Sequence, residues 1–423
     1  MVSTGNPFIP KVELSEIQKA YTRLAKYFRP SPLHFNDGLS QEYGCGVYLK
    51  REDLQRVRSY KIRGAFNKMK SCDPDDLKRG VVCASAGNHA QGVAMACQIL
   101  EVPGSIFMPA TTPSQKIKKV KYFGGDLVTI KIVGDTFDES FQEATAYAES
   151  RDLTFVHPFN DMKVIEGQAT TGIEILQQID KPIDILFIPI GGGGLAAGLG
   201  SYIKQMSPDT RIIGVEPTGA PAMHAAFKAG EVVELQKMDP FVDGAAVKQV
   251  GELNFQICKE VVDEIALVDE GQICQTILQL YNEEAIVVEP AGALTLAVLE
   301  QYREEIKGKK IVCLVSGGNN DITRTPEIKE RALLYQGLKH YFIIRFPQRA
   351  GALRDFVNKV LGPKDDITHF EYTKKHNRES GPALVGIVLK NPEDYQGLLT
   401  RMKAEEVQFK EINRDEMLFG LLV

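Results

Sequence analysis

Four short segments of the 423-residue chain contain residue types that could act together in catalysis. The first holds Lys61, within RSYKIRGAFNKM, where apolar residues recur at helical spacing, so we expect a helix to begin near Lys61 with Ser59 as its cap. A lysine is unusual in a first helical turn, because the positive end of the helix dipole disfavours an ammonium. The same location favours the neutral amine that forms an imine with an aldehyde. Taken alone, a solvated surface lysine is the simpler interpretation.

The second segment, SAGNHAQG at residues 85–92, links an expected strand at 81–84 to a helix that includes Val93. Such a loop presents backbone N–H groups and a hydroxyl at a helix N-terminus, which suits a carboxylate. Asn88 adds an amide that can donate a hydrogen bond to a phenolic oxygen. Ordinary turn and cap chemistry would account for the same residue types.

The third segment, GGGGLAAG at residues 191–198, follows an apolar strand expected at 183–190 and opens a helix. Four consecutive glycines let backbone amides close around a phosphate without interference from Cβ atoms. A dinucleotide site is the alternative, because Gly191, Gly193 and Ala196 fit G-x-G-x-x-A. Glu216, at the end of the next expected strand, would then bind a ribose. That fingerprint usually occupies the first βαβ unit, whereas this one lies halfway along the chain.

The fourth segment, VSGGNN at residues 315–320, follows a strand expected at 310–315. Ser316 could donate a hydrogen bond to a ring nitrogen at the mouth of the sheet, although a simple turn would explain it too. The histidines do not have metal-ligand spacing, and no serine lies in a G-x-S-x-G elbow, so we expect no metal.

Buried strands alternate with helices as far as about residue 325, which predicts parallel sheets covered on both faces. Further strands are expected at 105–108, 127–133 and 211–216, and a basic helix at 114–123. We assign residues 1–325 to a catalytic domain of two α/β subdomains and 326–338 to a connector. Residues 339–423 have the order β-α-β-β-α-β of a ferredoxin-like unit, with its second strand at 367–375, a turn at HNRESG (376–381) and its third strand at 383–390.

The composition excludes several classes of protein. The formal net charge is −5, without a long single-sign block, so neither nucleic acid nor an anionic membrane surface is an expected partner. The longest apolar stretches are too short to cross a bilayer, and the N-terminus lacks a signal pattern. Seven dispersed cysteines without a C-x-x-C pair predict reduced thiols and a cytoplasmic protein.

A lysine, an asparagine loop, a glycine-rich cup and a serine match the needs of one cofactor, pyridoxal phosphate, which requires an imine partner, a phosphate site and hydrogen bonds to its ring hydroxyl and ring nitrogen. With these motifs the chain resembles the biosynthetic threonine dehydratases, which are pyridoxal-phosphate enzymes of fold type II, the tryptophan synthase β-subunit fold. Further motifs that carry the resemblance are VYLKREDLQ, GVEP, VDGAAV, VEPAGA and SGGNND. FPQRAGAL, residues 346–353, is similar to the ACT-like regulatory domain, which is present once, as in the short form of the family.

The resemblance implies a role for each candidate residue. Lys61 would bind the cofactor covalently and then remove the substrate α-proton, Asn88 would contact the ring hydroxyl, and Ser316 the ring nitrogen. The phosphate would lie on the backbone amides of Gly191, Gly192, Gly193, Gly194 and Leu195. The substrate carboxylate and the pocket wall would involve Ser85, Ala86, Gly87, His89, Gly244 and Ala245. The family commonly has phenylalanine before the lysine, where this chain has Tyr60.

The expected reaction is the first step of isoleucine biosynthesis, the conversion of L-threonine to 2-oxobutanoate and ammonia through enamine and imine intermediates. Ser316 favours elimination, because an alcohol leaves the ring nitrogen neutral and disfavours a long-lived carbanion. Isoleucine is the expected inhibitor, acting through the C-terminal unit, whose first loop contains Arg349 and Gly351, with valine a second effector and a homotetramer the expected assembly. The alternatives are a catabolic serine/threonine dehydratase or serine racemase, an NAD-dependent dehydrogenase, and an amino-acid sensor without catalysis.

Overall fold

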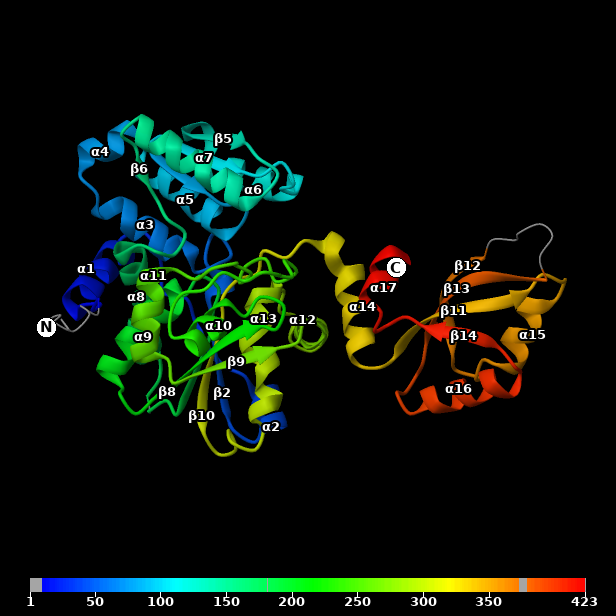
Figure 1. Ribbon diagram of the computed structural model, residues 1–423. Coiled ribbons are helices and arrows are strands. Elements are labelled where there is room, and N and C mark those ends of the chain that lie inside the picture. Colours follow the sequence, from blue (N-terminus) through cyan, green and yellow to red (C-terminus); the bar gives the residue numbers. More distant parts are fainter. Residues whose placement is uncertain (1–9, 181, 373–378, 423) are drawn as a thin grey trace, which may run out of the picture. The chain divides into compact units, whose positions relative to one another are not determined.

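The computed structural model describes residues 10–180, 182–372 and 379–422. The chain divides into two compact units, one ending at Ile322 and the other beginning at Thr323 (Figure 1). Within the described ranges, no helix has the length and apolar character needed to cross a membrane.

The smaller sheet of the first unit is parallel, with the strand order β5-β4-β3-β6. Its strands are β3 (Val81–Ala84), β4 (Gly104–Met108), β5 (Val128–Ile132) and β6 (Thr154–Phe155). Alternate residues of β3 face opposite ways: Val82 packs with helix α7 (Phe137–Ser150), whereas Val81 packs with α3 (Lys61–Ser71) and α5 (Asn88–Leu100). Helices α4 (Pro74–Arg79) and α6 (Ser114–Gly124) complete this subdomain, the cyan part of Figure 1.

The larger sheet has the order β1-β2-β10-β7-β8-β9, in which all neighbours are parallel except β1 and β2. Its strands are β1 (Leu33–Phe35), β2 (Gly46–Arg51), β7 (Ile185–Pro189), β8 (Arg211–Pro217), β9 (Glu264–Val268) and β10 (Lys310–Val315). Its helices are α1 (Leu14–Ala25), α2 (Asp37–Tyr43), α8 (Met162–Gln178), α9 (Gly194–Met206), α10 (Ala222–Ala229), α11 (Glu252–Val261), α12 (Glu270–Glu284) and α13 (Pro290–Ala297). Short 3₁₀ helices cover Glu52–Leu54, Gly125–Leu127, Val298–Tyr302 and Ile322–Arg324.

Helix α3 of the smaller subdomain crosses α8 of the larger one at glycines. A Cβ atom on Gly167 would lie 2.6 Å from the carbonyl oxygen of Arg63, and one on Gly64 would overlap the side chain of Gln168. The two backbones can approach this closely only because neither glycine has a side chain. The crossing fixes the helix that begins with Lys61 against the larger subdomain.

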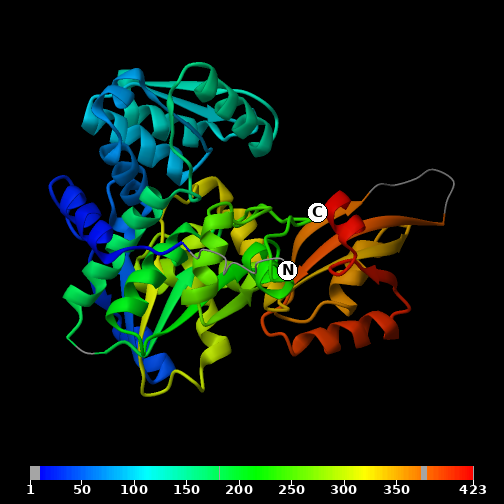
Figure 2. The same ribbon diagram turned by 60° about the vertical axis from the view of Figure 1, so that its left-hand side comes forward.

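The second unit is an antiparallel sheet of order β12-β13-β11-β14, the order of a ferredoxin-like fold; its strands are labelled in Figure 1, and the unit is orange to red in Figure 2. Its strands are β11 (Lys339–Pro347), β12 (Asp366–Tyr372), β13 (Ser380–Val388) and β14 (Gln408–Glu411). Its helices are α14 (Thr325–Tyr335), α15 (Ala352–Lys359), α16 (Asp394–Ala404) and α17 (Glu416–Leu422). Helices α15 and α16 cover one face of the sheet, and their apolar residues form its core with β11 and β13.

The predicted fold class is confirmed, with differences in detail. Strands β3 and β10 have the predicted bounds, and β7 is shorter than the predicted 183–190. The expectation of purely parallel sheets missed the antiparallel edge strand β1. In the predicted turn at HNRESG, residues 376–378 lie outside the described residues, and β13 already begins at Ser380.

Candidate active site

Three of the predicted segments follow the carboxyl ends of parallel strands. Ser85 follows β3, Gly191 lies two residues after the end of β7, and Ser316 follows β10. In open parallel sheets this edge is where ligands bind. The contacts described below connect the three loops with one another and with Lys61.

Lys61 is the first residue of α3. Its Nζ donates a hydrogen bond to the carbonyl of Pro158, at 3.1 Å, and lies 5.4 Å from the centre of the Tyr60 ring. Burial lowers the pKa of the Lys61 amine to about 8, an effect that the nearby Glu289 opposes. A substantial fraction of the amine is therefore neutral near pH 8, which is the form that attacks an aldehyde.

Ser59 does not cap α3, contrary to the prediction. The N-cap is Tyr60, without a side-chain hydrogen bond, and the buried Oγ of Ser59 has no partner within the described part of the chain. Ser59 instead forms a bridge with Gly317, while the N–H of Tyr60 donates to the carbonyl of Ser316 at 3.2 Å. Pairing with the loop after β10 thus fixes the start of α3, which brings Lys61 and Ser316 together.

The glycine loop forms a close-fitting cup at the start of α9. Gly193 has φ +92°, and a Cβ on Gly192 would overlap the ring of Phe159. Cβ atoms on Gly191 and Gly194 would lie 2.9 Å from the carbonyl oxygens of Ala245 and Phe159. No side chain from the described ranges caps α9, so the N–H groups of its first turn are left for an anion.

Hydrogen bonds from the start of helix α11 fix the orientation of the glycine loop. The carbonyl of Gly192 accepts hydrogen bonds from the side-chain amide of Asn254, at 2.6 Å, and from the N–H of Gly251, at 3.1 Å. A trans peptide points its N–H away from its carbonyl, so these bonds turn the N–H of Gly193 away from α11 and towards the cup. Asn254 is fully buried, which makes its hydrogen bond a fixed part of the loop.

Asn88, the first residue of α5, is held on two sides. Its Nδ2 donates to Glu289 at 2.6 Å, and its Oδ1 accepts from Asn319 at 2.7 Å. An amide NH₂ has two hydrogens, so one N–H of Asn88 remains for a further acceptor.

In the loop predicted to hold a substrate carboxylate, the N–H of Ser85 donates to the carbonyl of Phe107 at 3.0 Å, and the His89 side chain points away from the loop. The Oγ of Ser85 accepts from the N–H of Gly87 at 3.1 Å, and Gly87 is the N-cap of α5. The His89 ring is buried, with Nε2 2.8 Å from the carbonyl of Val156. Burial lowers the pKa of His89 to about 3, so its ring is neutral. The His89 ring therefore offers no positive charge to a substrate carboxylate.

The remaining predicted residues lie close to the same cup. The buried hydroxyl of Ser316 is 3.2 Å from the carbonyl of Ala291, to which it donates. Gly244 lies against Glu289 and Ala291, and Ala245 lies against Gly191. The structure therefore brings these three residues to the loops that carry Asn88 and the glycines.

Glu216 is not positioned to bind a ribose. It is fully buried, and its carboxylate accepts the N–H groups of Met223 and His224, each at 2.8 Å, at the start of α10. Burial raises the pKa of Glu216 to about 8. Because both carboxylate oxygens already accept hydrogen bonds from α10, the structure does not favour the dehydrogenase alternative.

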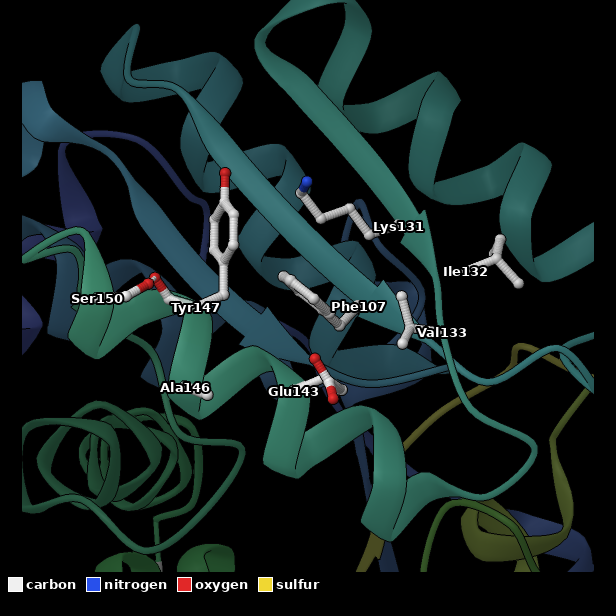
Figure 3. A pocket seen from close by; sticks show the side chains of 8 residues that line it. All are labelled: Phe107, Lys131, Ile132, Val133, Glu143, Ala146, Tyr147 and Ser150. Atoms are coloured by element: carbon white, nitrogen blue, oxygen red, sulfur yellow. Dashed lines mark hydrogen bonds between the residues drawn. The ribbon is translucent and has the colours of Figure 1, made fainter.

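A hollow of about 620 Å³ on the smaller subdomain lies apart from this site (Figure 3). It is lined from β4, β5 and α7, and the Lys131 amine lies 4.5 Å from the centre of the Tyr147 ring. It contains none of the predicted site residues, so it is not the candidate active site.

The residues present fit pyridoxal phosphate. The glycine cup has no room for Cβ atoms and exposes the first turn of α9, which suits a phosphate dianion. A buried amine with a lowered pKa and a spare asparagine N–H supply two of the other contacts, and the Ser316 hydroxyl supplies the third when its proton rotates from the Ala291 carbonyl to the ring nitrogen. No carboxylate follows β10 at the position of Ser316.

Sequence reasoning missed four features of the site: Asn254, Glu289, Asn319 and the loop at residues 157–160. In that loop, Nδ1 of His157 accepts the N–H groups of Phe159 and Asn160, at 3.1 and 2.8 Å. The loop carries both the carbonyl that binds Lys61 and the ring that lies against Gly192. Of the four, only Glu289 and Asn319 lie in motifs that carried the family resemblance, VEPAGA and SGGNND.

Comparison with known proteins indicates the family of this chain. Residues 24–317 match the family model described as pyridoxal-phosphate dependent enzyme, and residues 330–422 match the C-terminal regulatory domain of threonine dehydratase. The "L-threonine dehydratase biosynthetic IlvA" of Halalkalibacterium halodurans is 55% identical over 413 residues, covering 98% of this chain and 100% of the relative. The corresponding protein of Bacillus subtilis is 54% identical over 412 residues, covering 97% and 98%.

Among solved structures, the processed form of threonine deaminase isoform 2 from Solanum lycopersicum is 41% identical, with a TM-score of 0.71 over 76% of this chain and 95% of that one. The fold of this chain and the motifs described above place it in the class of pyridoxal-phosphate enzymes of fold type II. Within that class, the chain belongs to the family of biosynthetic threonine dehydratases.

Proposed function

We propose that this protein converts L-threonine to 2-oxobutanoate and ammonia, the reaction that begins isoleucine biosynthesis. The observation that supports this most directly is the meeting of the Lys61 amine, the glycine cup, Asn88 and Ser316 at one edge of two sheets. The water lost when the β-hydroxyl leaves is returned when the resulting unsaturated amine rearranges and hydrolyses, so the net products are the oxo acid and ammonia.

Lys61 has two tasks at its Nζ atom. Pyridoxal phosphate, when bound, supplies an aldehyde that condenses with amines and a ring that withdraws electrons from the substrate α-carbon. Lys61 first holds the cofactor covalently and, once the substrate amine has displaced it, takes the α-proton. Its lowered pKa keeps part of the amine neutral for both tasks.

The backbone does most of the binding. The N–H groups of Gly191 to Leu195 bind the phosphate at the start of α9, and Ser85, Ala86, Gly87 and His89 hold the substrate carboxylate at the start of α5. Gly244 and Ala245 line the pocket beside the cup. Both anions thus lie at the positive ends of helices.

Ser316 and Asn88 contact the cofactor ring and so influence which reaction follows removal of the α-proton. The Ser316 hydroxyl is not ionised near neutrality, so it does not hold a proton on the ring nitrogen as a carboxylate would. This favours prompt loss of the β-hydroxyl over racemisation. Asn88 donates its remaining N–H to the ring hydroxyl.

The test is to add L-threonine and follow 2-oxobutanoate, with L-serine and D-serine as competing substrates. Efficient turnover of threonine supports the proposal, whereas interconversion of L- and D-serine without oxo-acid formation would favour serine racemase, and no turnover would favour a sensor. Lys61→Ala should lose the visible absorbance of the bound cofactor and all activity, because the cofactor aldehyde then lacks the buried amine with which it condenses.

For the regulatory unit we propose isoleucine as the inhibitor, with valine competing for its site. A hollow of about 420 Å³ lies beside β11, α15 and β14. Its floor includes the buried Phe346, Phe356 and Val360, and its rim carries charges of both signs, among them Arg349 and Glu379. An apolar side chain with a carboxylate and an ammonium matches this combination. Arg349→Gln should weaken isoleucine inhibition and leave uninhibited turnover unchanged, with Lys410→Gln as the control.

We also propose a homotetramer in the cytoplasm. Light scattering tests the assembly. Within the described residues, which include all seven cysteines, no disulfide forms, and six of the seven are buried, which suits a reducing compartment.

A further inference from the structure

Glu289 is a buried carboxylate that the proposed mechanism does not use. It is the N-cap residue of α13, but its side chain makes no hydrogen bond to that helix. The carboxylate accepts the Asn88 Nδ2 hydrogen bond at 2.6 Å instead. Only 5% of the residue is exposed.

The backbone around Glu289 leaves room for its carboxylate. A Cβ atom on Gly317 would collide with its Oε1, and a Cβ on Gly244 would lie 3.3 Å from the same atom. Gly317 directly follows Ser316, and Gly244 is one of the residues that line the pocket. Glu289 thus lies between three loops of the site, and any side chain at Gly317 would displace it.

Charged groups from several elements face Glu289. Burial raises its pKa to about 7, Asp243 adds to the effect, and the hydrogen bond from Asn88 and the charge of Lys116 oppose it. The charge of Glu289 in turn tends to raise the pKa of Lys61, Lys119 and Tyr60. Its carboxylate is therefore ionised above a pH of about 7, and within the described residues it forms no ion pair.

Glu289 also completes the fixation of Asn88. Asn319 donates to the Oδ1 of Asn88, and Lys119 donates to the Oδ1 of Asn319 at 3.0 Å. With Oδ1 occupied on one side and one N–H bound to Glu289 on the other, the amide of Asn88 has a single orientation. Its second N–H then has a fixed direction.

We infer that Glu289 is a positioning residue that fixes the Asn88 amide towards the ring hydroxyl of the cofactor and supplies the negative charge that keeps the lysine–cofactor linkage protonated. The inference rests on the proposed function only in requiring that Lys61 binds the cofactor. A negative charge at close range favours the protonated, positively charged linkage. Removing it should lower the pH at which that proton is lost.

The experiment compares the holoenzyme with Glu289→Gln and Glu289→Asp. In Glu289→Gln, the pH midpoint of the visible absorbance should fall by about one unit, since one nearby charge shifts a pKa by ~1–3 units. The variant should also lower kcat while the KM for threonine stays within about twofold. Glu289→Asp keeps the charge but withdraws it by one methylene, so the midpoint should stay near that of the wild type while cofactor affinity falls. Glu289→Asp also provides a readout if Glu289→Gln does not fold.

Glu166→Gln is the matched control, because Glu166 is a buried glutamate on α8 that pairs with Lys163. It should leave the midpoint unchanged. An unchanged midpoint in Glu289→Gln, or an equal shift in Glu166→Gln, would overturn the inference. A wild-type protein without a visible band would instead overturn the proposed function.

Discussion

Replacing Arg63 should destabilise the protein strongly, because Arg63 neutralises two buried carboxylates. It lies two residues after Lys61 on α3, and its guanidinium binds Glu52 and Glu174 at 2.7 to 2.8 Å. Lys50 also pairs with Glu174, at 2.8 Å. The four side chains carry two charges of each sign, and all four are buried. Arg63→Met therefore leaves one uncompensated negative charge inside the protein.

The cost of breaking a buried pair by removing one partner is about 3–5 kcal/mol, a large fraction of a typical free energy of unfolding. Urea unfolding at several pH values measures it. Although burial opposes the effect, the Arg63 charge lowers the pKa of Glu52. In the wild type, this lowered pKa stabilises the fold above the unfolded pKa of a glutamate, ~4.3, and the contribution is lost as the pH falls below it.

In Arg63→Met, burial acts on Glu52 without that opposing charge, so folding favours its protonation. The destabilisation should therefore be largest near pH 8 and shrink as the pH falls towards 5. Arg303→Met is the control, because Arg303 and its partner Glu300 are 35% and 55% exposed, and it should destabilise the protein far less than Arg63→Met does. A loss below 1 kcal/mol in Arg63→Met, or one that does not depend on pH, would refute the reasoning.

Two further predictions concern cofactor binding. Asn254→Leu removes the amide that orients Gly192, which should weaken cofactor binding to the apoenzyme roughly tenfold, as expected for a buried hydrogen bond worth ~1–2 kcal/mol. Gln256→Leu on the same helix is the control, and equal cofactor affinities of the two variants in fluorescence titrations would contradict the role of Asn254. The association rate of pyridoxal phosphate with the apoenzyme should rise with pH through about 8, where Lys61 loses its proton. A rate that stays constant between pH 6.5 and 9 in stopped-flow absorbance would rule this out.

The sequence predicted those elements that are specified by neighbouring residues in the chain. Strands β3 and β10 are buried apolar runs that end at glycine- or serine-rich turns, so their bounds could be predicted. The loops at Ser85, Gly191 and Ser316 could be located for the same reason.

The missed residues depend on contacts across long stretches of chain. Asn88 and Glu289 are 201 residues apart, and Asn254 and Gly192 are 62 apart. Nothing in the residues around Glu289 or Asn254 indicates which loop they will reach. Ser59 failed as a cap because pairing with Gly317, a partner far along the chain, competed with the local capping geometry.

The position of β10 in the larger sheet has a consequence for synthesis of the protein on the ribosome. β10 lies between β2 and β7, although it is the last strand of its unit to be translated. At ~5–20 residues per second, β1 and β2 wait roughly ten seconds to a minute for their central neighbour to emerge. During that interval the nascent chain exposes an unpaired strand edge, so it needs protection from aggregation. Capture of the cofactor in its complete site can only follow the emergence of Ser316.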